Sequence, residues 1–245
     1  LCYVDLARAL GEEHLFYGIQ HPSLVGVDTE SETLEEMAAD YVTRIRTKQA
    51  KGPYRLMGWS MGGVIAFEMA RQLQEAGEDI GFVGVIDGVA PRDGEHVMPH
   101  DHHEFLLQIL AQDMGISYES LDLGLLKSGT LDEGLRYVLR LAKDAKILPW
   151  NYRIKEFRKL FDVFQGNLRA LNAYYAGHFA GEVHVYRAEK TFEQHKGAHD
   201  DLNWGSHCDE VASTHTVSGS HFTLIREPNV GGLAAFINEA LAKNQ

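Results

Sequence analysis

Hydrophobic positions in the first ninety residues alternate between helical spacing and short apolar runs. A helical pattern from Leu1 to Leu10 stops at Gly11, and two more cover Leu34–Ile45 and Val64–Leu73. Thr29 and Glu32 have the spacing of a capping box before the second helix. The apolar runs, which predict strands, are Leu15–Ile19, Tyr54–Met57 and Phe82–Ile86. This alternation is typical of a parallel sheet with crossover helices.

The pattern changes after Ala90. From residue 90 to about 180 no strand pattern is found, and Gly and Pro separate several helical segments. The last of these carries an apolar stripe that includes Phe157, Phe161 and Phe164. Strand patterns return at 183–188 and 212–217, before a C-terminal amphipathic helix over 230–242. We therefore expect one α/β domain over residues 1–245 with a helical insertion over 90–180.

Composition and charge narrow the range of functions. The 245 residues are 44% hydrophobic and 24% charged, as in ordinary globular proteins, and the net charge is -12. This charge opposes binding to nucleic acid or to an anionic membrane. The sequence holds no apolar stretch of membrane-spanning length. With only Cys2 and Cys208 available, we expect a reducing, cytoplasmic setting.

A nucleophile motif lies between a predicted strand and a predicted helix. The sequence Gly58-Trp59-Ser60-Met61-Gly62 matches the Gly-x-Ser-x-Gly elbow. A direct turn from strand to helix strains the serine backbone and leaves no room for flanking side chains, which explains both glycines. Ser60 is the predicted nucleophile, and the Met61 backbone N–H at the helix start is a predicted oxyanion donor. The alternative is a Gly-Ser turn without chemistry.

A nucleophilic serine requires a histidine base and a carboxylate that orients it, in the chain order Ser, acid, His. Asp87 directly follows an apolar strand, and Glu189 follows a later one. Asp87 is favoured because it ends a fully apolar strand, whereas Glu189 lies among charged residues. The alternative role for Asp87 is a helix or turn cap.

Thirteen histidines compete for the role of base. His221 follows the last predicted strand in a short loop before the C-terminal helix, at the sheet edge where ligands bind in such folds. The others in or beside regular patterns are set aside: His14, His21, His178 and His195 as residues of polar turns, and His184 and His215 as residues within strands. His221 is therefore the predicted base.

The run His100, Asp101, His102, His103 and Glu104 raises the question of a metal site. Its spacing matches no compact zinc pattern, no cysteine is near, and Asp101 is well placed to cap a helix. We therefore expect no metal there.

Three blocks of sequence resemble the thioesterase domains that end non-ribosomal peptide synthetases. The blocks are Gly58-Trp59-Ser60-Met61-Gly62-Gly63-Val64-Ile65-Ala66-Phe67-Glu68-Met69-Ala70, Val85-Ile86-Asp87 with Ala90-Pro91, and Ser218-Gly219-Ser220-His221-Phe222-Thr223. The resemblance implies an α/β-hydrolase fold, a Ser60-Asp87-His221 triad and a lid formed by the insertion. Because stand-alone editing thioesterases place their acid after the following strand, Asp87 favours the terminal, product-releasing type.

The resemblance also implies the substrate and partner. A peptidyl or acyl chain would arrive as a thioester on the phosphopantetheine arm of an upstream carrier domain, with no tightly bound cofactor or metal. Release would follow acyl-serine formation, by hydrolysis, macrocyclisation or oligomerisation. The family's second oxyanion donor and first strand would lie before Leu1, a start compatible with a piece of a longer protein.

Two functional alternatives remain at this stage. A stand-alone thioesterase or general carboxylesterase would use the same triad, and a non-catalytic α/β-hydrolase would only bind a ligand or partner. The Phe157–Phe164 stripe would either exclude water from the acyl-enzyme or simply pack the lid helices together.

Overall fold

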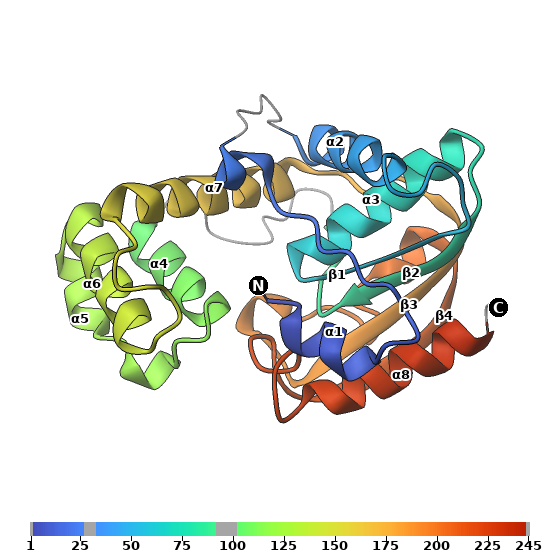
Figure 1. Cartoon of the computed structure of the whole chain (residues 1–245). Helices are drawn as coiled ribbons and strands as arrows, with labels where there is room; N and C mark the ends of the chain where they lie inside the picture. The colour runs from blue at the N-terminus through green and yellow to red at the C-terminus, as the bar shows by residue number, and fades with distance from the viewer. Residues whose placement is uncertain (1, 27–32, 92–101, 244–245) are drawn as a thin grey trace.

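A parallel sheet forms the centre of the protein (Figure 1). The computed structural model describes residues 2–26, 33–91 and 102–243. Within them the strands are β1 (Tyr54–Trp59), β2 (Ile80–Ile86), β3 (Phe179–Lys190) and β4 (Cys208–Ser220), and each pairs in parallel with the next. The predicted parallel α/β architecture is confirmed.

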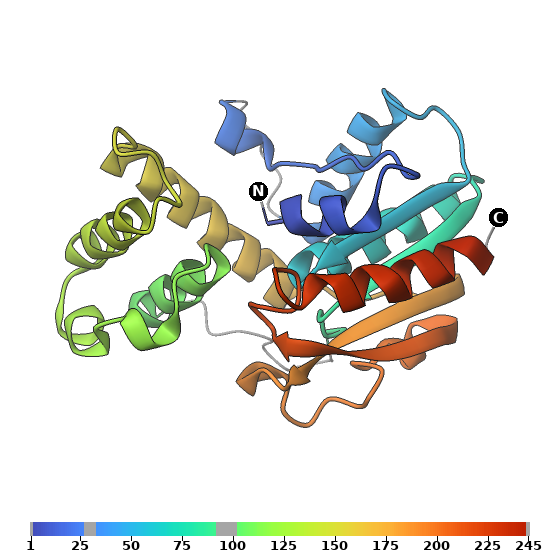
Figure 2. The same cartoon turned by 60° about the horizontal axis from the view of Figure 1, so that its bottom comes forward.

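Helices cover both faces of this sheet, as Figures 1 and 2 show. One face carries α2 (Leu34–Arg46) and α3 (Met61–Glu75), and the other carries α1 (Val4–Leu10) and α8 (Val230–Lys243). Each face has its own apolar core, with Phe67 and Val85 in the first and Ile86 and Leu233 in the second. Because both of its faces are covered, the central strand β2 carries a continuous apolar run that made it readable in the sequence, whereas β4, at one end of the described sheet, is largely exposed.

The connection from β2 to β3 contains a group of helices at the side of the sheet (Figure 2). These are α4 (His103–Asp113), α5 (Leu123–Ser128), α6 (Leu131–Asp144) and α7 (Ile154–Ala173). Phe157 and Phe161 are 0% and 1% exposed, and Phe164 packs against the same apolar cluster. The α7 stripe therefore holds helices together, and helix packing is the better of its two interpretations.

The strand predicted at residues 15–19 is wrong, and the capping box predicted at Thr29 and Glu32 falls outside the described residues. Residues 15–19 form no strand; Leu15 is 88% exposed and Tyr17 65%. Without a neighbouring strand to pair with, this apolar run lies in an irregular surface segment. Thr29 and Glu32 lie outside the described residues, and the capping box of α2 is made by Thr33 and Glu36.

Short 3-10 helices complete the described chain, at Pro22–Val25, Tyr118–Ser120, Glu193–His195 and Trp204–Ser206. Among the described helices, none combines the length and the apolar character that crossing a bilayer requires.

Candidate active site

Ser60 occupies the sharp turn between β1 and α3, with φ 57° and ψ -129°. A non-glycine residue in this region costs roughly 1–3 kcal/mol, so its surroundings must enforce it. A Cβ on Gly58 would overlap the backbone carbonyl of Gly62, and one on Gly62 would lie 2.7 Å from the Tyr3 hydroxyl. Gly58 is therefore required by close packing of strand against helix, as the motif predicts, whereas Gly62 is restricted by one side chain beside the start of α1.

Asp87 lies at the carboxyl end of β2 and is 2% exposed. Its backbone N–H donates to the Tyr186 carbonyl over 2.7 Å, and its Oδ1 accepts from the Ala188 N–H over 2.8 Å. Burial opposes ionisation of this carboxyl, but its hydrogen bond to His221 and the nearby imidazoles outweigh burial and lower its pKa. Asp87 is thus a fixed, ionised acceptor.

His221 follows β4 and joins Asp87 to Ser60. Its Nδ1 lies 2.7 Å from Asp87 Oδ2, and its Nε2 lies 3.1 Å from Ser60 Oγ. Phe192 stacks on the imidazole at 4.7 Å, and Trp59 Nε1 donates to the His221 carbonyl over 2.9 Å. The three side chains singled out in the sequence therefore meet at the edge of the sheet where the chain leaves β1, β2 and β4.

This arrangement has the connectivity of nucleophilic acyl transfer. A proton on Nδ1 of His221 that is donated to Asp87 leaves the Nε2 lone pair directed at the Ser60 hydroxyl. A hydroxyl in this position can lose its proton as it attacks a carbonyl.

Comparison with known families identifies the chain. The family model described as "Thioesterase domain" matches residues 1–241. The chain belongs to the thioesterase-domain family, whose members are hydrolases.

Relatives of this thioesterase domain are much longer proteins. It is 38% identical over 114 residues to a dimodular nonribosomal peptide synthase of Bacillus subtilis, covering 45% of this chain and 5% of that protein. It is 27% identical over 224 residues to a probable non-canonical nonribosomal peptide synthetase, CymA, of Salinispora arenicola, covering 91% and 3%. The chain thus spans only a small part of these relatives.

Solved structures agree on the fold. A four-domain nonribosomal peptide synthetase, holo-AB3403, is similar with a TM-score of 0.80 and 27% identity, over 97% of this chain and 18% of that one. The Vlm2 thioesterase domain is similar with a TM-score of 0.70 and 23% identity, over 97% and 88%. The α/β-hydrolase fold is confirmed.

The structure also shows where the other residues considered for the thioesterase site lie. Met61 is the first residue of α3, so its N–H has no acceptor within the helix. Glu189 is exposed, and it is Asp87 that contacts His221. His100 and Asp101 lie outside the described residues. Within the described part, His102, His103 and Glu104 form no compact set of ligands.

A second histidine beside Asp87 was not predicted. His195, set aside in the sequence as a residue of a polar turn, is 8% exposed, and its Nδ1 lies 3.7 Å from Asp87 Oδ2. Its ring meets that of His221 edge-on at 5.3 Å. Burial lowers the pKa of His195 to about 4 although Asp87 acts in the opposite direction, so the imidazole is neutral.

The helical insertion between β2 and β3 also contacts the loop that carries His221. Arg226, five residues beyond the histidine, donates to the backbone carbonyl of Asp113 at the end of α4 over 2.5 Å. Burial raises the pKa of the Asp113 carboxyl to about 7, against the opposing charges of His221 and Arg226. These residues connect the helical insertion to the loop that follows β4, and no sequence pattern marked them.

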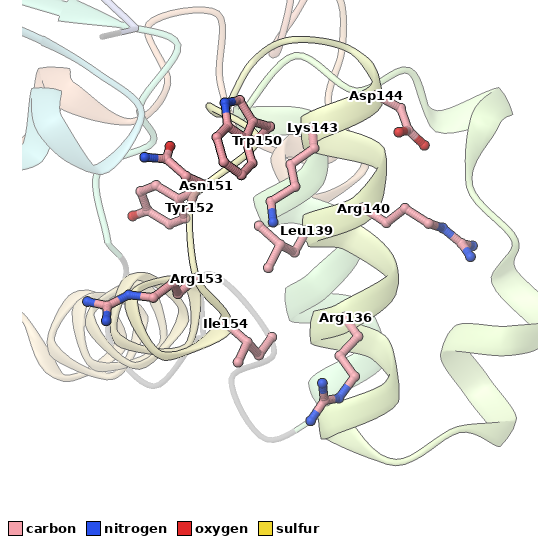
Figure 3. A pocket seen from close by; sticks show the side chains of 10 residues that line it. All are labelled: Arg136, Leu139, Arg140, Lys143, Asp144, Trp150, Asn151, Tyr152, Arg153 and Ile154. Atoms are coloured by element: carbon pink, nitrogen blue, oxygen red, sulfur yellow. The ribbon is translucent and has the colours of Figure 1, made fainter.

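A cavity of about 550 Å³ lies on the helical insertion, and Ser60, Asp87 and His221 are not among its lining residues (Figure 3). Its lining residues come from α6 and from the loop that leads into α7: Arg136, Leu139, Arg140, Lys143, Asp144, Trp150, Asn151, Tyr152, Arg153 and Ile154. A smaller cavity of about 350 Å³ borders Asp87 and His195.

Proposed function

We propose that this thioesterase domain releases a peptidyl or acyl chain from the phosphopantetheine thioester of an upstream carrier domain. The observation that carries the proposal is the hydrogen-bonded chain Asp87–His221–Ser60 in a member of the thioesterase family. The peptide synthetases among its relatives support the nature of the substrate. We propose no resident cofactor, because the pantetheine arm belongs to the substrate.

Acylation of Ser60 is the first half of the proposed reaction. His221 Nε2 takes the hydroxyl proton while Ser60 Oγ attacks the thioester carbonyl, and Asp87 stabilises the resulting imidazolium. The tetrahedral intermediate then expels the pantetheine thiolate, and the His221 imidazolium gives its proton to this leaving group, so that neutral His221 is restored. A thiol of pKa ~8.5 is a good leaving group, so stabilisation of the oxyanion is the more demanding requirement. We assign one donor to it, the Met61 N–H at the positive end of α3.

Deacylation determines the product. His221 removes a proton from the second nucleophile, which attacks the acyl-Ser60 carbonyl, and Ser60 regains its proton as it leaves. Water gives a free acid, whereas a hydroxyl or amine of the bound chain gives a macrocycle or an oligomer. A Vlm2 thioesterase domain has been solved with a bound dodecadepsipeptide. That likeness supports a site able to hold a long acyl chain.

We further propose that residues 1–245 form a single catalytic domain in which residues 90–180 are the lid. The apolar cluster that includes Phe161 of the lid and Phe67 of α3 supports this organisation. We expect the domain to act in the cytoplasm, where free Cys2 and Cys208 would remain reduced.

The test is mass spectrometry of the protein after incubation with acyl and peptidyl pantetheine thioesters. We expect an acyl adduct on Ser60 and a released product, with both lost in Ser60→Ala and retained in the control Ser206→Ala, which alters an exposed serine. Equal rates on simple oxygen esters would favour a general esterase. Absence of both adduct and turnover, with no reaction towards a fluorophosphonate, would indicate a binding module.

A further inference from the structure

Three potential metal ligands converge behind the catalytic serine. Asp87, His195 and His221 are all buried, and one ligand atom from each lies within 4.8 Å of the others. Asp87 Oδ2 lies 2.7 Å from His221 Nδ1 and 3.7 Å from His195 Nδ1. The proposed reaction uses the first of these contacts and leaves His195 without a role.

We infer that these three side chains form an inhibitory zinc site. Zinc bonds of about 2.0–2.1 Å in a tetrahedron separate neighbouring ligand atoms by roughly 3.3 Å. The separations of 2.7 and 3.7 Å lie on either side of that value, and no two ligand atoms are more than 4.8 Å apart, so a movement of about 1 Å by each side chain would accommodate the ion. Two imidazoles and one carboxylate are a common ligand set for zinc.

The surroundings provide access and support for the ligands. The cavity of about 350 Å³ that borders Asp87 and His195 offers a path for the ion and room for water as a fourth ligand. The Ala188 N–H holds Asp87 Oδ1, which leaves Oδ2 for the metal. Phe192 stacks on His221 and meets His195 edge-on at 5.2 Å, so one aromatic ring orients both imidazoles.

Each of the two cationic side chains that border this cavity forms an ion pair with a nearby carboxylate. Arg187 and Lys196 border the same cavity, but Arg187 is paired with Asp200 and Lys196 with Glu193. The Asp87 carboxylate therefore remains as negative charge for a divalent ion. Because the ion must displace an existing hydrogen bond, we expect binding at about micromolar zinc.

Zinc would inhibit the enzyme because it changes which nitrogen of His221 carries the ring proton. This step of the inference rests on the proposed function. Zinc on His221 Nδ1 requires the single ring proton to move, through exchange with solvent, from Nδ1 to Nε2. No proton is lost from the neutral ring, but Nε2 then lacks the lone pair that would accept the Ser60 proton. The metal would therefore block acylation without contacting the serine.

Binding is tested separately from turnover, by titrating zinc into the Ser60→Ala protein in a calorimeter. When His195→Asn is added to Ser60→Ala, we expect the protein to bind one equivalent of zinc fewer, or the Kd for zinc to rise about tenfold or more. His195→Phe, which keeps an aromatic ring in the buried position, serves as a second variant if the first is unstable. Unchanged binding in both variants overturns the proposal.

Two controls remove histidines elsewhere. His178→Asn breaks an exposed His–Asp pair, in which His178 Nε2 lies 2.8 Å from Asp209, and a His102→Asn, His103→Asn double variant removes the pair beside Glu104. We expect both to bind zinc like the parent. Loss of the zinc equivalent in a control, rather than in His195→Asn, would place the ion on the surface and contradict the site.

Inhibition is then measured on the active protein. We expect micromolar zinc to lower thioester turnover at least about tenfold, chelator to restore it, and His195→Asn to be resistant. Binding without inhibition would contradict the inhibitory assignment. Absence of turnover in zinc-free wild-type protein would instead count against the proposed function and leave the calorimetric result intact.

Discussion

Ser60 has a backbone conformation that few side-chain-bearing residues adopt, and its neighbours enforce it. The Ser60 N–H donates to the Ile86 carbonyl over 2.8 Å, and the Ser60 carbonyl accepts from the Gly63 N–H over 2.9 Å. Gly58 approaches the start of α3 so closely that no Cβ fits. The strain at one residue is therefore borne by contacts between a strand and a helix.

Gly58→Ala tests this constraint. Because its methyl group would overlap backbone rather than a flexible side chain, we expect a loss of more than about 3 kcal/mol in unfolding free energy, or failure to fold. Gly166→Ala in α7 is the matched control: nothing lies within 4 Å of the added methyl, and helix propensity predicts a gain of up to about 1 kcal/mol. Urea denaturation measures both, and a near-native midpoint for Gly58→Ala would contradict the argument.

The sequence allowed three site residues to be predicted because each lies just after a predicted strand, His221 across Ser218-Gly219-Ser220. Ser60, Asp87 and His221 follow β1, β2 and β4, and parallel strands bring such positions to one edge. His195 carries no such signal. Its burial depends on how the chain between β3 and β4 folds back over Asp87, and its polar neighbours resemble those of an exposed turn.

At the scale of elements, a buried glutamate connects α3 to the end of the lid helix α7. Glu68 is 0% exposed and accepts hydrogen bonds of 2.8 Å from the Tyr174 hydroxyl, Arg71 Nε and Gln72 Nε2. Burial alone would raise the pKa of Glu68, but these donors outweigh it and lower the pKa. The charged carboxylate is therefore the form that the fold prefers.

Glu68→Gln should destabilise the protein in a pH-dependent way. A lowered folded-state pKa gives stability that is present above the unfolded value of 4.5 and is lost as pH falls through the folded value. We expect a loss of about 2–3 kcal/mol at pH 7 that shrinks below about pH 4. Glu75→Gln, which alters an exposed partner of the same Arg71, should cost less than about 1 kcal/mol at either pH. A pH-independent loss in Glu68→Gln would contradict the assignment.

Most elements were predictable from periodicity because burial on one or both faces imposes it. The helix predicted over 34–45 is α2, and the stripe that begins at Ile154 is α7. The failure at Leu15–Ile19 has the opposite cause, since Leu15, Tyr17 and Ile19 are exposed and none of the described strands pairs with this segment. Strand ends were missed where polar residues such as Asp209 and Glu210 continue the ladder, as at residues 208–211 of β4.

At the scale of the whole molecule, one apolar cluster joins the lid to the sheet. It contains Phe161 of α7 and Leu107 of α4 together with Phe67 of α3 and Val85 of β2. A continuous core predicts that lid and sheet unfold together.

Phe161→Ala should therefore lower the stability of the entire chain. We expect one denaturation transition, displaced by about 3–5 kcal/mol, when far-ultraviolet circular dichroism and tryptophan fluorescence are compared. Trp150→Ala, which removes an aromatic side chain that is 86% exposed, should leave the midpoint within about 0.5 kcal/mol. Separate transitions from the two probes would show that the lid is an independent unit and would contradict the proposed single domain.

The hydrogen bond from the Trp59 indole to the His221 carbonyl has a consequence for trapping complexes. Together with the stacked Phe192 ring, it holds the imidazole through contacts that do not involve Asp87. Asp87→Asn would then disturb the ring's tautomer and charge while leaving its position largely set. This variant would bind the carrier-bound chain without reacting with it. The complex of the variant with its carrier domain could then be imaged.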